Sequence, residues 1–318
     1  MTAAGILPRS FYIKQTNEKG CEPLSKAKEK IMQIVFLLSA LVSVAAVAAI
    51  CIFLFAQGIP AIAEIGPVKF LLGTRWKPSQ ELFGILPMIV GSIYVTAGAV
   101  IVGVPIGILT AVFLYKYCPK KLYKLIKPAI DLLAGIPSIV YGFFALVVIV
   151  PIVQQLTETS GKGMFTASLL LGIMILPTVI STSEAALRAV PSSYYEGSLA
   201  LGATKERSIF LSVFPAARSG IFSGIILGIG RAIGETMAVV MIIGNQAVFP
   251  KTLFSGVRTM TANIVLEMAY AEGLHLKALI ATAVVLFVFI MIINISFSCL
   301  KESGKKQGKK NEAKKKTV

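Results

Sequence analysis

Histidine and cysteine, which often hold metal ions or act in catalysis, are scarce in this sequence of 318 residues. His275 is the single histidine, and Cys21, Cys51, Cys118 and Cys299 are scattered along the chain without metal-type spacing. The sequence therefore argues against a zinc site and against a Ser-His-Asp triad. Two cysteines fall in predicted cytosolic segments and two in predicted spans, so we expect free thiols.

A nucleotide-binding loop is missing as well. The pattern G-x-x-x-x-G-K-[ST] does not occur, because the Gly161-Lys162 and Gly308-Lys309 pairs lack its flanking residues. We also find no long internal repeat. If ATP drives this protein, a partner chain binds the ATP and its Mg²⁺, and we expect no cofactor in this chain.

Acidic and charged residues are also few. Asp and Glu number 15 against 31 Lys and Arg, the net charge is +16, and 14% of residues are charged. The hydrophobic fraction of 56% and the mean hydropathy of +0.81 exclude an ordinary soluble domain. Because the positive charge lies beside apolar runs, we assign it to membrane orientation and lipid headgroups and expect no nucleic-acid partner.

Six apolar runs are long enough to cross a hydrocarbon layer of about 30 Å. None alternates as a barrel strand does, so the sequence predicts an all-α membrane protein with six transmembrane helices. The first run is longer than the apolar core of a cleaved signal peptide. The predicted spans are 31–56, 82–115, 128–152, 164–186, 219–244 and 276–299.

The second run, 82–115, is longer than one crossing requires. It tilts, bends near Pro105, or begins with an interfacial segment around 83–87. The spans divide the chain into a tail at 1–30, an external loop at 57–83, a core at 84–299 and a basic tail at 300–318.

Lysine and arginine decide the predicted orientation. They are concentrated in the two tails, in the loop 116–127 and in the central loop 191–218. The positive-inside rule places all four in the cytosol of a multi-pass plasma (inner) membrane protein. We expect the tail from Lys301 to be disordered.

The central loop 191–218 is polar and lies between two apolar spans. Ser193 and Glu196 have the spacing of a capping box, which predicts the start of a helix. Gly202 can adopt the left-handed conformation that ends a helix, and Thr204 can cap a second one. The sequence therefore predicts two short helices joined by a glycine turn.

The same loop resembles the EAA loop of ABC importer permeases. Glu196, Gly202 and Pro215 stand at the family spacing E-x5-G-x12-P, although Gly197-Ser198 replaces the usual pair of alanines. The resemblance implies that this loop docks into a cleft of a partner ATPase. The coupling residues are then Glu196, Gly202, Ala203 and Pro215.

Arg231 and Glu235 lie four residues apart in the predicted span 219–244, so on one continuous helix they share a face. A charge in the middle of a span must be paired or face a water-filled interior. One interpretation is a neutralised structural pair. The other is that Arg231 meets an anion and Glu235 orients Arg231, with glycines at 224, 228, 230 and 234 allowing close helix packing.

The predicted span 128–152 offers two hydroxyl groups, those of Ser138 and Tyr141, to an anion. Helix packing is the alternative role for both. Glu184 and Arg188 form an i,i+4 pair near the end of the predicted span 164–186, which we interpret as structural.

Four segments together resemble the permease subunits of phosphate-specific ABC importers, and among these PstC more than its sister permease PstA. The segment that favours PstC runs from the tryptophan to FGILP. The four segments are WKPSQELFGILPMIVGS (76–92), LAGIPSIVYGFF (133–144), the loop 191–218 and GRAIGETMAVVMIIGN (230–245).

The resemblance implies a type I ABC importer permease (MetI-like) core preceded by one extra helix. It implies four kinds of partner: membrane lipid, a PstA-like second permease, a PstB-like ATPase dimer and a PstS-like external phosphate-binding protein. The chain would then be a non-catalytic subunit that conducts inorganic phosphate. A related oxyanion such as phosphonate stays open as substrate. A secondary transporter and a membrane-embedded enzyme are weaker alternatives, because the sequence lacks matching halves and a catalytic cluster.

Overall fold

The computed structural model describes the backbone of residues 23–315 and the side chains of residues 28–296. Within these ranges six helices are long and apolar enough to cross a membrane, as the sequence predicts. The predictions for residues 1–22 and for the thiols of Cys21 and Cys299 lie outside the described backbone or side chains. Cys51 and Cys118 are free thiols, as expected.

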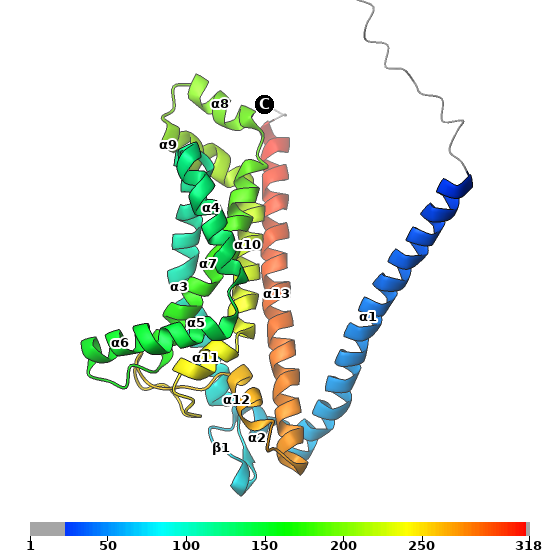
Figure 1. Cartoon of the computed structure of the whole chain (residues 1–318), viewed down its shortest axis with the longest axis vertical. Helices are drawn as coiled ribbons and strands as arrows, with labels where there is room; N and C mark the ends of the chain where they lie inside the picture. The colour runs from blue at the N-terminus through cyan, green and yellow to red at the C-terminus, as the bar shows by residue number, and fades with distance from the viewer. Residues whose placement is uncertain (1–22, 316–318) are drawn as a thin grey trace, which may run out of the picture. The chain divides into compact units, whose positions relative to one another are not determined.

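The described backbone is mostly helical, with one short β-hairpin and one isolated β-bridge between Gly244 and Val257. Figure 1 labels most of the elements. η1 is a 3₁₀ turn, whereas η2, η3 and η4 are π-helical turns. In chain order the elements are α1 (Pro23–Ile65), α2 (Pro67–Leu72), β1 (Trp76–Lys77), η1 (Pro78–Gln80), β2 (Leu82–Phe83), α3 (Leu86–Val112), η2 (Phe113–Tyr117), α4 (Lys120–Gly135), α5 (Ser138–Phe144), η3 (Ala145–Ile149), α6 (Val150–Thr157), α7 (Met164–Arg188), α8 (Ser192–Ala200), α9 (Lys205–Ser208), η4 (Ile209–Val213), α10 (Phe214–Gly234), α11 (Met237–Ile242), α12 (Met260–Glu267) and α13 (Gly273–Lys315).

Two compact units divide the chain, Met1–Phe53 and Leu54–Val318. The described part of the first is the α1 helix up to Phe53, and every other element belongs to the second. Within the second unit, α8 and α9 lie at one end and β1 and α12 at the other (Figure 1). We call these the α8 end and the hairpin end.

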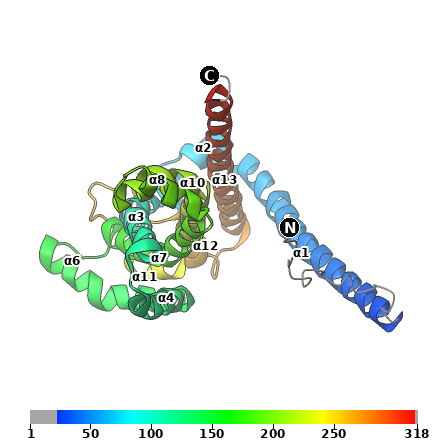
Figure 2. The same cartoon turned by 90° about the horizontal axis from the view of Figure 1, so that it is seen from above.

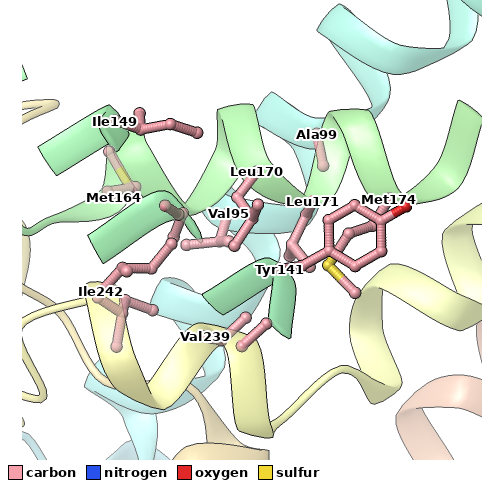
Figure 3. Packing of buried hydrophobic residues seen from close by; sticks show 14 of the residues in the cluster. Val95, Ala99, Tyr141, Ile149, Met164, Leu170, Leu171, Met174, Val239 and Ile242 are labelled. Atoms are coloured by element: carbon pink, nitrogen blue, oxygen red, sulfur yellow. The ribbon is translucent and has the colours of Figure 1, made fainter. Parts of the chain in front are cut away.

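The centre of the second unit is a lengthwise packing of α7 against α3 and α10 (Figures 1 and 2). A Cβ atom at Gly103 of α3 would lie 2.6 Å from the Gly172 carbonyl oxygen of α7, so only glycine permits this approach. Apolar side chains of α3, α5, α7 and α11 interlock beside this contact (Figure 3). The candidate site is built on this rigid base.

The predicted span 128–152 is not one helix. Ile136 is extended, with ψ 128°, and separates α4 from α5. The ring of Pro137 disfavours the helical conformation for the residue before it, which is why the helix ends here. Most of the predicted basic loop 116–127 is therefore helical, as part of η2 and α4, and the membrane-length helix is Ser138–Thr157.

The predicted span 219–244 is also broken. α10 ends at Gly234, Glu235 is extended with ψ 131°, and α11 begins at Met237. Glycine costs a helix about 1 kcal/mol relative to alanine, so Gly234 weakens the helix at this point. The Glu235 carbonyl oxygen accepts a hydrogen bond from Thr261 Oγ1 at 3.2 Å, a tertiary contact that holds the extended conformation.

Two further boundaries differ from the predicted ones. The run 82–115 begins with β2, which pairs with β1 so that Trp76 lies opposite Phe83. α3 then starts at Leu86 and continues through Pro105 without a break. The segment 83–87 therefore contains the end of β2, a short connection and the first residues of α3. α13 continues to Lys315, where the sequence predicts disorder from Lys301. The Lys, Gln, Glu and Ala residues of that stretch are good helix formers, which favours continuation.

Candidate functional site

Arg231, in the last turn of α10, faces a cavity of about 420 Å³. Its Nη1 donates a long hydrogen bond of 3.4 Å to Thr178 Oγ1 of α7. An added Cβ atom at Gly230 would meet no heavy atom within 4 Å, which leaves the guanidinium room beside the helix. The described residues that line the cavity include no carboxylate: they are Thr178, Ile226, Leu227, Gly230, Arg231 and Asn294.

Glu235 does not reach this arginine as a helix neighbour. Its Oε1 accepts a hydrogen bond from the backbone N–H of Ala238 at 3.3 Å, at the start of α11. The prediction that Arg231 and Glu235 share one helix face is wrong, because α10 ends between them at Gly234. Among the side chains that the structure describes, the two residues form no ion pair.

Ser138 and Tyr141 are also absent from the walls of the Arg231 cavity. The Tyr141 hydroxyl donates to the Leu133 carbonyl oxygen at 2.8 Å, across the break between α4 and α5. Its ring is buried in the cluster of Figure 3. This geometry favours the helix-packing alternative for Tyr141.

The loop 191–218 has the predicted glycine turn but differs from the prediction at two points. The second helix is not short, because α9, η4 and α10 form one continuous helical run, Lys205–Gly234, so the span begins well before residue 219. α8 begins at Ser192 after Pro191, so Ser193 lies inside the helix and forms no capping box. The predictions for the two other positions are confirmed. Gly202 has φ +82°, and Thr204 Oγ1 accepts a hydrogen bond from the Arg207 N–H at 3.3 Å.

The outer surface of this loop carries apolar side chains. Leu201 is 90% exposed and Tyr194 is 52% exposed. Glu196, Gly202 and Pro215 are also exposed, whereas Ala203 is half-buried. Exposed large apolar groups on a rigid two-helix turn are typical of a surface that a partner covers. The four predicted coupling residues therefore belong to one segment that presents an unpartnered face.

A buried carboxylate, Glu184, stabilises the base of that loop. It is 3% exposed, and its Oε1 accepts hydrogen bonds from Tyr123 Oη and Arg188 Nε, each at 2.8 Å. Lys127 Nζ lies 3.4 Å from its Oε2. The predicted i,i+4 pair of Glu184 and Arg188 is confirmed. The hydrogen bond to this carboxylate raises the pKa of the Tyr123 phenol above its ordinary value.

A second buried carboxylate, Glu267 at the hairpin end, was not found from the sequence. Its Oε2 accepts from Trp76 Nε1 at 2.8 Å and lies 2.8 Å from His275 Nε2, while its Oε1 accepts from Arg258 Nη1 at 2.6 Å. These four residues, which we call the Glu267 cluster, tie the hairpin, the segment before α12, α12 and α13 together. Trp76 is 191 positions from Glu267, so no local pattern signals the contact.

A group of at least three His, Cys, Asp or Glu side chains placed to hold a metal ion would mark a metal centre, and no such group occurs among the described residues. The buried carboxylates of Glu184 and Glu267 instead bind side chains of neighbouring segments of the chain. Arg231, by contrast, lines a cavity whose described walls contain no carboxylate.

Comparisons with known proteins agree with this architecture. Residues 103–302 match the family described as "Binding-protein-dependent transport system inner membrane component". A "Probable ABC transporter permease protein YqgH" of Bacillus subtilis (strain 168) is 39% identical over 236 residues, which cover 73% of this chain and 76% of that protein.

Two more similarities concern a second relative and a solved structure. A "Phosphate transport system permease protein PstC" of Mesorhizobium japonicum is 36% identical over 265 residues, or 77% of this chain and 81% of that protein. An inward-facing structure of the MetNI methionine ABC transporter matches with a TM-score of 0.56 and 20% identity, covering 72% of this chain and 99% of the other. At that identity the structural likeness concerns the fold alone.

Proposed function

Because the chain belongs to the family of binding-protein-dependent ABC importer permeases, we propose that it is the PstC-type subunit that conducts inorganic phosphate into the cell. Members of this family are membrane subunits that work with an ATPase and a substrate-binding protein, and they are generally non-catalytic. The observation that carries the proposal is the guanidinium of Arg231, which faces a cavity with no carboxylate in its described walls.

The chemistry of Arg231 suits a phosphate ion. Phosphate loses part of its hydration when it enters an apolar span, and a fixed positive group replaces some of that hydration. A guanidinium stays charged at physiological pH and donates two parallel hydrogen bonds to an oxyanion. Glu235 accepts a hydrogen bond from the first turn of α11 and would act by fixing the helix break that follows Arg231 rather than by pairing with Arg231. Ser138 and Tyr141 would shape the neighbouring helix packing.

The exposed loop 191–218 supports coupling to an ATPase. Leu201 and Tyr194 would fill apolar sites on the ATPase, while Glu196, Gly202, Ala203 and Pro215 set the shape of the loop. The α8 end is then cytosolic and the hairpin end external. The full importer would contain a PstA-like permease, a PstB-like ATPase dimer that binds ATP and Mg²⁺, and a PstS-like phosphate-binding protein.

The decisive experiment measures uptake of radiolabelled phosphate, normalised to the amount of complex in the membrane. Arg231→Gln should lower uptake by at least about tenfold, because a charge-assisted hydrogen bond is worth about 1.5–3 kcal/mol. Arg231→Lys should restore part of the activity, since lysine keeps the positive charge but cannot donate the two parallel hydrogen bonds of a guanidinium. Lys277→Gln, which removes an exposed cation outside the cavity, is the control and should transport normally.

Several outcomes would revise the proposal. Normal uptake by an assembled Arg231→Gln complex would remove Arg231 from the pathway. Uptake of another oxyanion in place of phosphate would assign the chain to a related importer. A PstA-type identity would appear as co-purification with a PstC-type partner. Phosphate uptake with no co-purifying ATPase would favour a secondary transporter.

Coupling is tested at Gly202. Its φ of +82° is a conformation that β-branched residues rarely adopt, so Gly202→Val should distort the turn and cost about 1–3 kcal/mol locally. ATP hydrolysis and phosphate uptake should become uncoupled, or co-purification of the ATPase should weaken. Gly197→Ala is the matched control, because Gly197 is helical and an added Cβ meets no atom within 4 Å. Normal coupling in Gly202→Val would refute this role.

Orientation is tested by single cysteines in a cysteine-free background. Cysteines that replace Thr159 and Ala247 should react with an impermeant thiol reagent added to sealed cells, because the proposal places both outside. A cysteine that replaces Gly308 should react only after the cells are opened. Labelling of the Gly308→Cys variant from outside would reverse the orientation.

A further inference from the structure

Asn294 is an amide in an apolar helix. It lies in the segment Gly273–Ser296 of α13, which has the hydropathy of a membrane span. Its side chain is half-buried and lines the cavity that Arg231 faces. Among the described residues its amide has no recorded hydrogen-bond partner, and an unpaired amide in an apolar medium is costly. A ligand in the cavity would supply that partner.

The three polar groups in the cavity walls have different hydrogen-bonding abilities. The Arg231 guanidinium only donates. Thr178 Oγ1 already accepts from Arg231, so its own proton is available for donation. Asn294 adds two donor protons on Nδ2 and an acceptor, Oδ1. The cavity thus presents one positive charge, several donors and one neutral amide acceptor.

This combination fits an oxyanion that keeps a proton. Hydrogen phosphate has oxygens that accept from arginine and one hydroxyl group that must donate. Sulfate has the same tetrahedral shape but no such hydroxyl group at physiological pH. Asn294 Oδ1 can accept the hydroxyl proton of hydrogen phosphate while Nδ2 donates to another of its oxygens. With sulfate only the donor contact can form, and the amide oxygen is left unpaired.

We propose that Asn294 is a second substrate-contacting residue, whose amide oxygen accepts the proton of hydrogen phosphate or of a similar protonated oxyanion held by Arg231. This inference rests on the proposed role of Arg231 in the pathway. It assigns a preference for protonated oxyanions to the permease itself, in addition to whatever selection the binding protein makes. The neutral amide provides the acceptor without the repulsion that a carboxylate would exert on an anion.

The test uses Leu227, which lines the cavity and is 61% exposed, as the position of a reporter cysteine. Leu227→Cys is made in the cysteine-free, full importer, purified in detergent without nucleotide. The rate of its reaction with a neutral maleimide is measured against increasing phosphate or sulfate at mildly alkaline pH, where both ions are dianions. Phosphate should protect the thiol at a concentration about tenfold lower than sulfate, the effect of one hydrogen bond to the hydroxyl group.

Two variants then separate the inference from the proposed function. Asn294→Leu should remove the preference for phosphate over sulfate, because phosphate loses both a donor and an acceptor contact whereas sulfate loses only the donor contact. Arg231→Gln should abolish protection by both ions. Ser296→Ala is the matched control on the same helix, because its hydroxyl bonds to the Ile292 carbonyl oxygen and does not line the cavity.

The outcomes are distinguishable. An unchanged phosphate preference in Asn294→Leu, with protection still lost in Arg231→Gln, overturns the role of Asn294 and leaves the Arg231 site standing. The same variant failing to co-purify with the second permease would make Asn294 a helix-contact residue instead and would also overturn the inference. Absence of protection by either ion in the parent protein would contradict the proposed site itself.

Discussion

Arg258 and Arg231 both lie among packed helices, yet their surroundings differ. Arg258 Nη1 contacts both Glu267 and Asn263, and its Nε donates to the Asn245 carbonyl oxygen. Arg231 has one long hydrogen bond, to Thr178, and an open cavity. The same side chain therefore serves two purposes. In the Glu267 cluster its charge is neutralised and holds chain segments together, whereas in the cavity it remains available to a ligand.

The Glu184 group lies between these extremes. Its carboxylate is as buried as that of Glu267, but Arg188 is 47% exposed and Lys127 is 24% exposed, against 18% for Arg258. Water therefore screens part of each of its ion pairs. The three regions thus form a series. Arg258 is in a largely buried ion pair, Arg188 is in an ion pair partly screened by water, and Arg231 has no carboxylate among the described residues that line its cavity. Substitutions along that series test whether the comparison is sound.

The largest loss of stability is expected for Glu267→Gln. It leaves the Arg258 charge without its carboxylate in a largely buried position, which costs about 3–5 kcal/mol. The amount of complex in the membrane and its midpoint of thermal unfolding should both fall. Glu272→Gln, at an exposed position of the same region, is the control and should unfold like the parent. Equal unfolding of both variants would show that the Glu267 cluster is not a structural clamp.

Glu184→Gln should have an intermediate effect of about 2 kcal/mol, between the values for exposed and buried ion pairs. After the carboxylate charge is lost, the side chains of Lys127 and Arg188 can reorient and be hydrated by water, because both are partly exposed. Arg258 beside Glu267 is less exposed and can do so less readily. Thermal unfolding of the purified complex measures the difference. Because Glu184 stabilises the base of the loop 191–218, ATPase co-purification should be recorded in parallel. If Glu184→Gln lowers the free energy of unfolding as much as Glu267→Gln does, solvent exposure of the paired cations does not explain the difference between the two sites.

Trp76→Phe should cost about 1.5 kcal/mol, the lower end of the range for a hydrogen bond to a charged group. The substitution removes the N–H that donates to Glu267 and keeps an aromatic ring against Phe83, whose ring centroid lies 5.6 Å from that of Trp76. The carboxylate retains Arg258 and His275. Trp76→Leu, which also removes the aromatic contact, should unfold at a lower temperature than Trp76→Phe. Identical unfolding midpoints for Trp76→Phe and Trp76→Leu would show that the aromatic contact with Phe83 adds no stability beyond the hydrogen bond.

The smallest change in stability is expected for Arg231→Met, within about 1 kcal/mol of the parent, because no carboxylate loses its partner. Phosphate uptake should nevertheless be lost. A variant that folds normally but does not transport would show most clearly that Arg231, unlike Arg258, serves transport and not stability. An unfolding midpoint as low as that of Glu267→Gln would place Arg231 among the structural ion pairs.

Local patterns predicted much of the molecule. Runs of apolar residues gave six spans, because the length needed to cross a membrane depends on composition alone. The turn at Gly202, the Thr204 cap and the pair of Glu184 and Arg188 were also predicted, since each depends on neighbours within four positions. The failed capping box at Ser193 is a local error: the N-cap is Pro191, two residues earlier than the capping box predicts.

Other features depend on residues far apart in the chain. The break at Glu235 depends on Thr261, 26 positions away, and this break separates Arg231 from the acidic residue that sequence spacing had paired with it. The Glu267 cluster joins residues as distant as Trp76, and the Arg231 cavity joins Thr178 and Asn294. Each of these contacts arises only when separate helices pack.

The sequence by itself determined that this is a helical membrane protein with six spans and a polar loop of the importer type, because hydropathy and turn chemistry act over a few neighbouring residues. Tertiary structure alone decided that Arg258 is paired with Glu267 and that Arg231 is not paired with Glu235. An isolated helix cannot neutralise an arginine whose partner lies on another element, so burial, helix breaks and the approach of α7, α10 and α13 leave Arg258 paired and Arg231 facing a cavity.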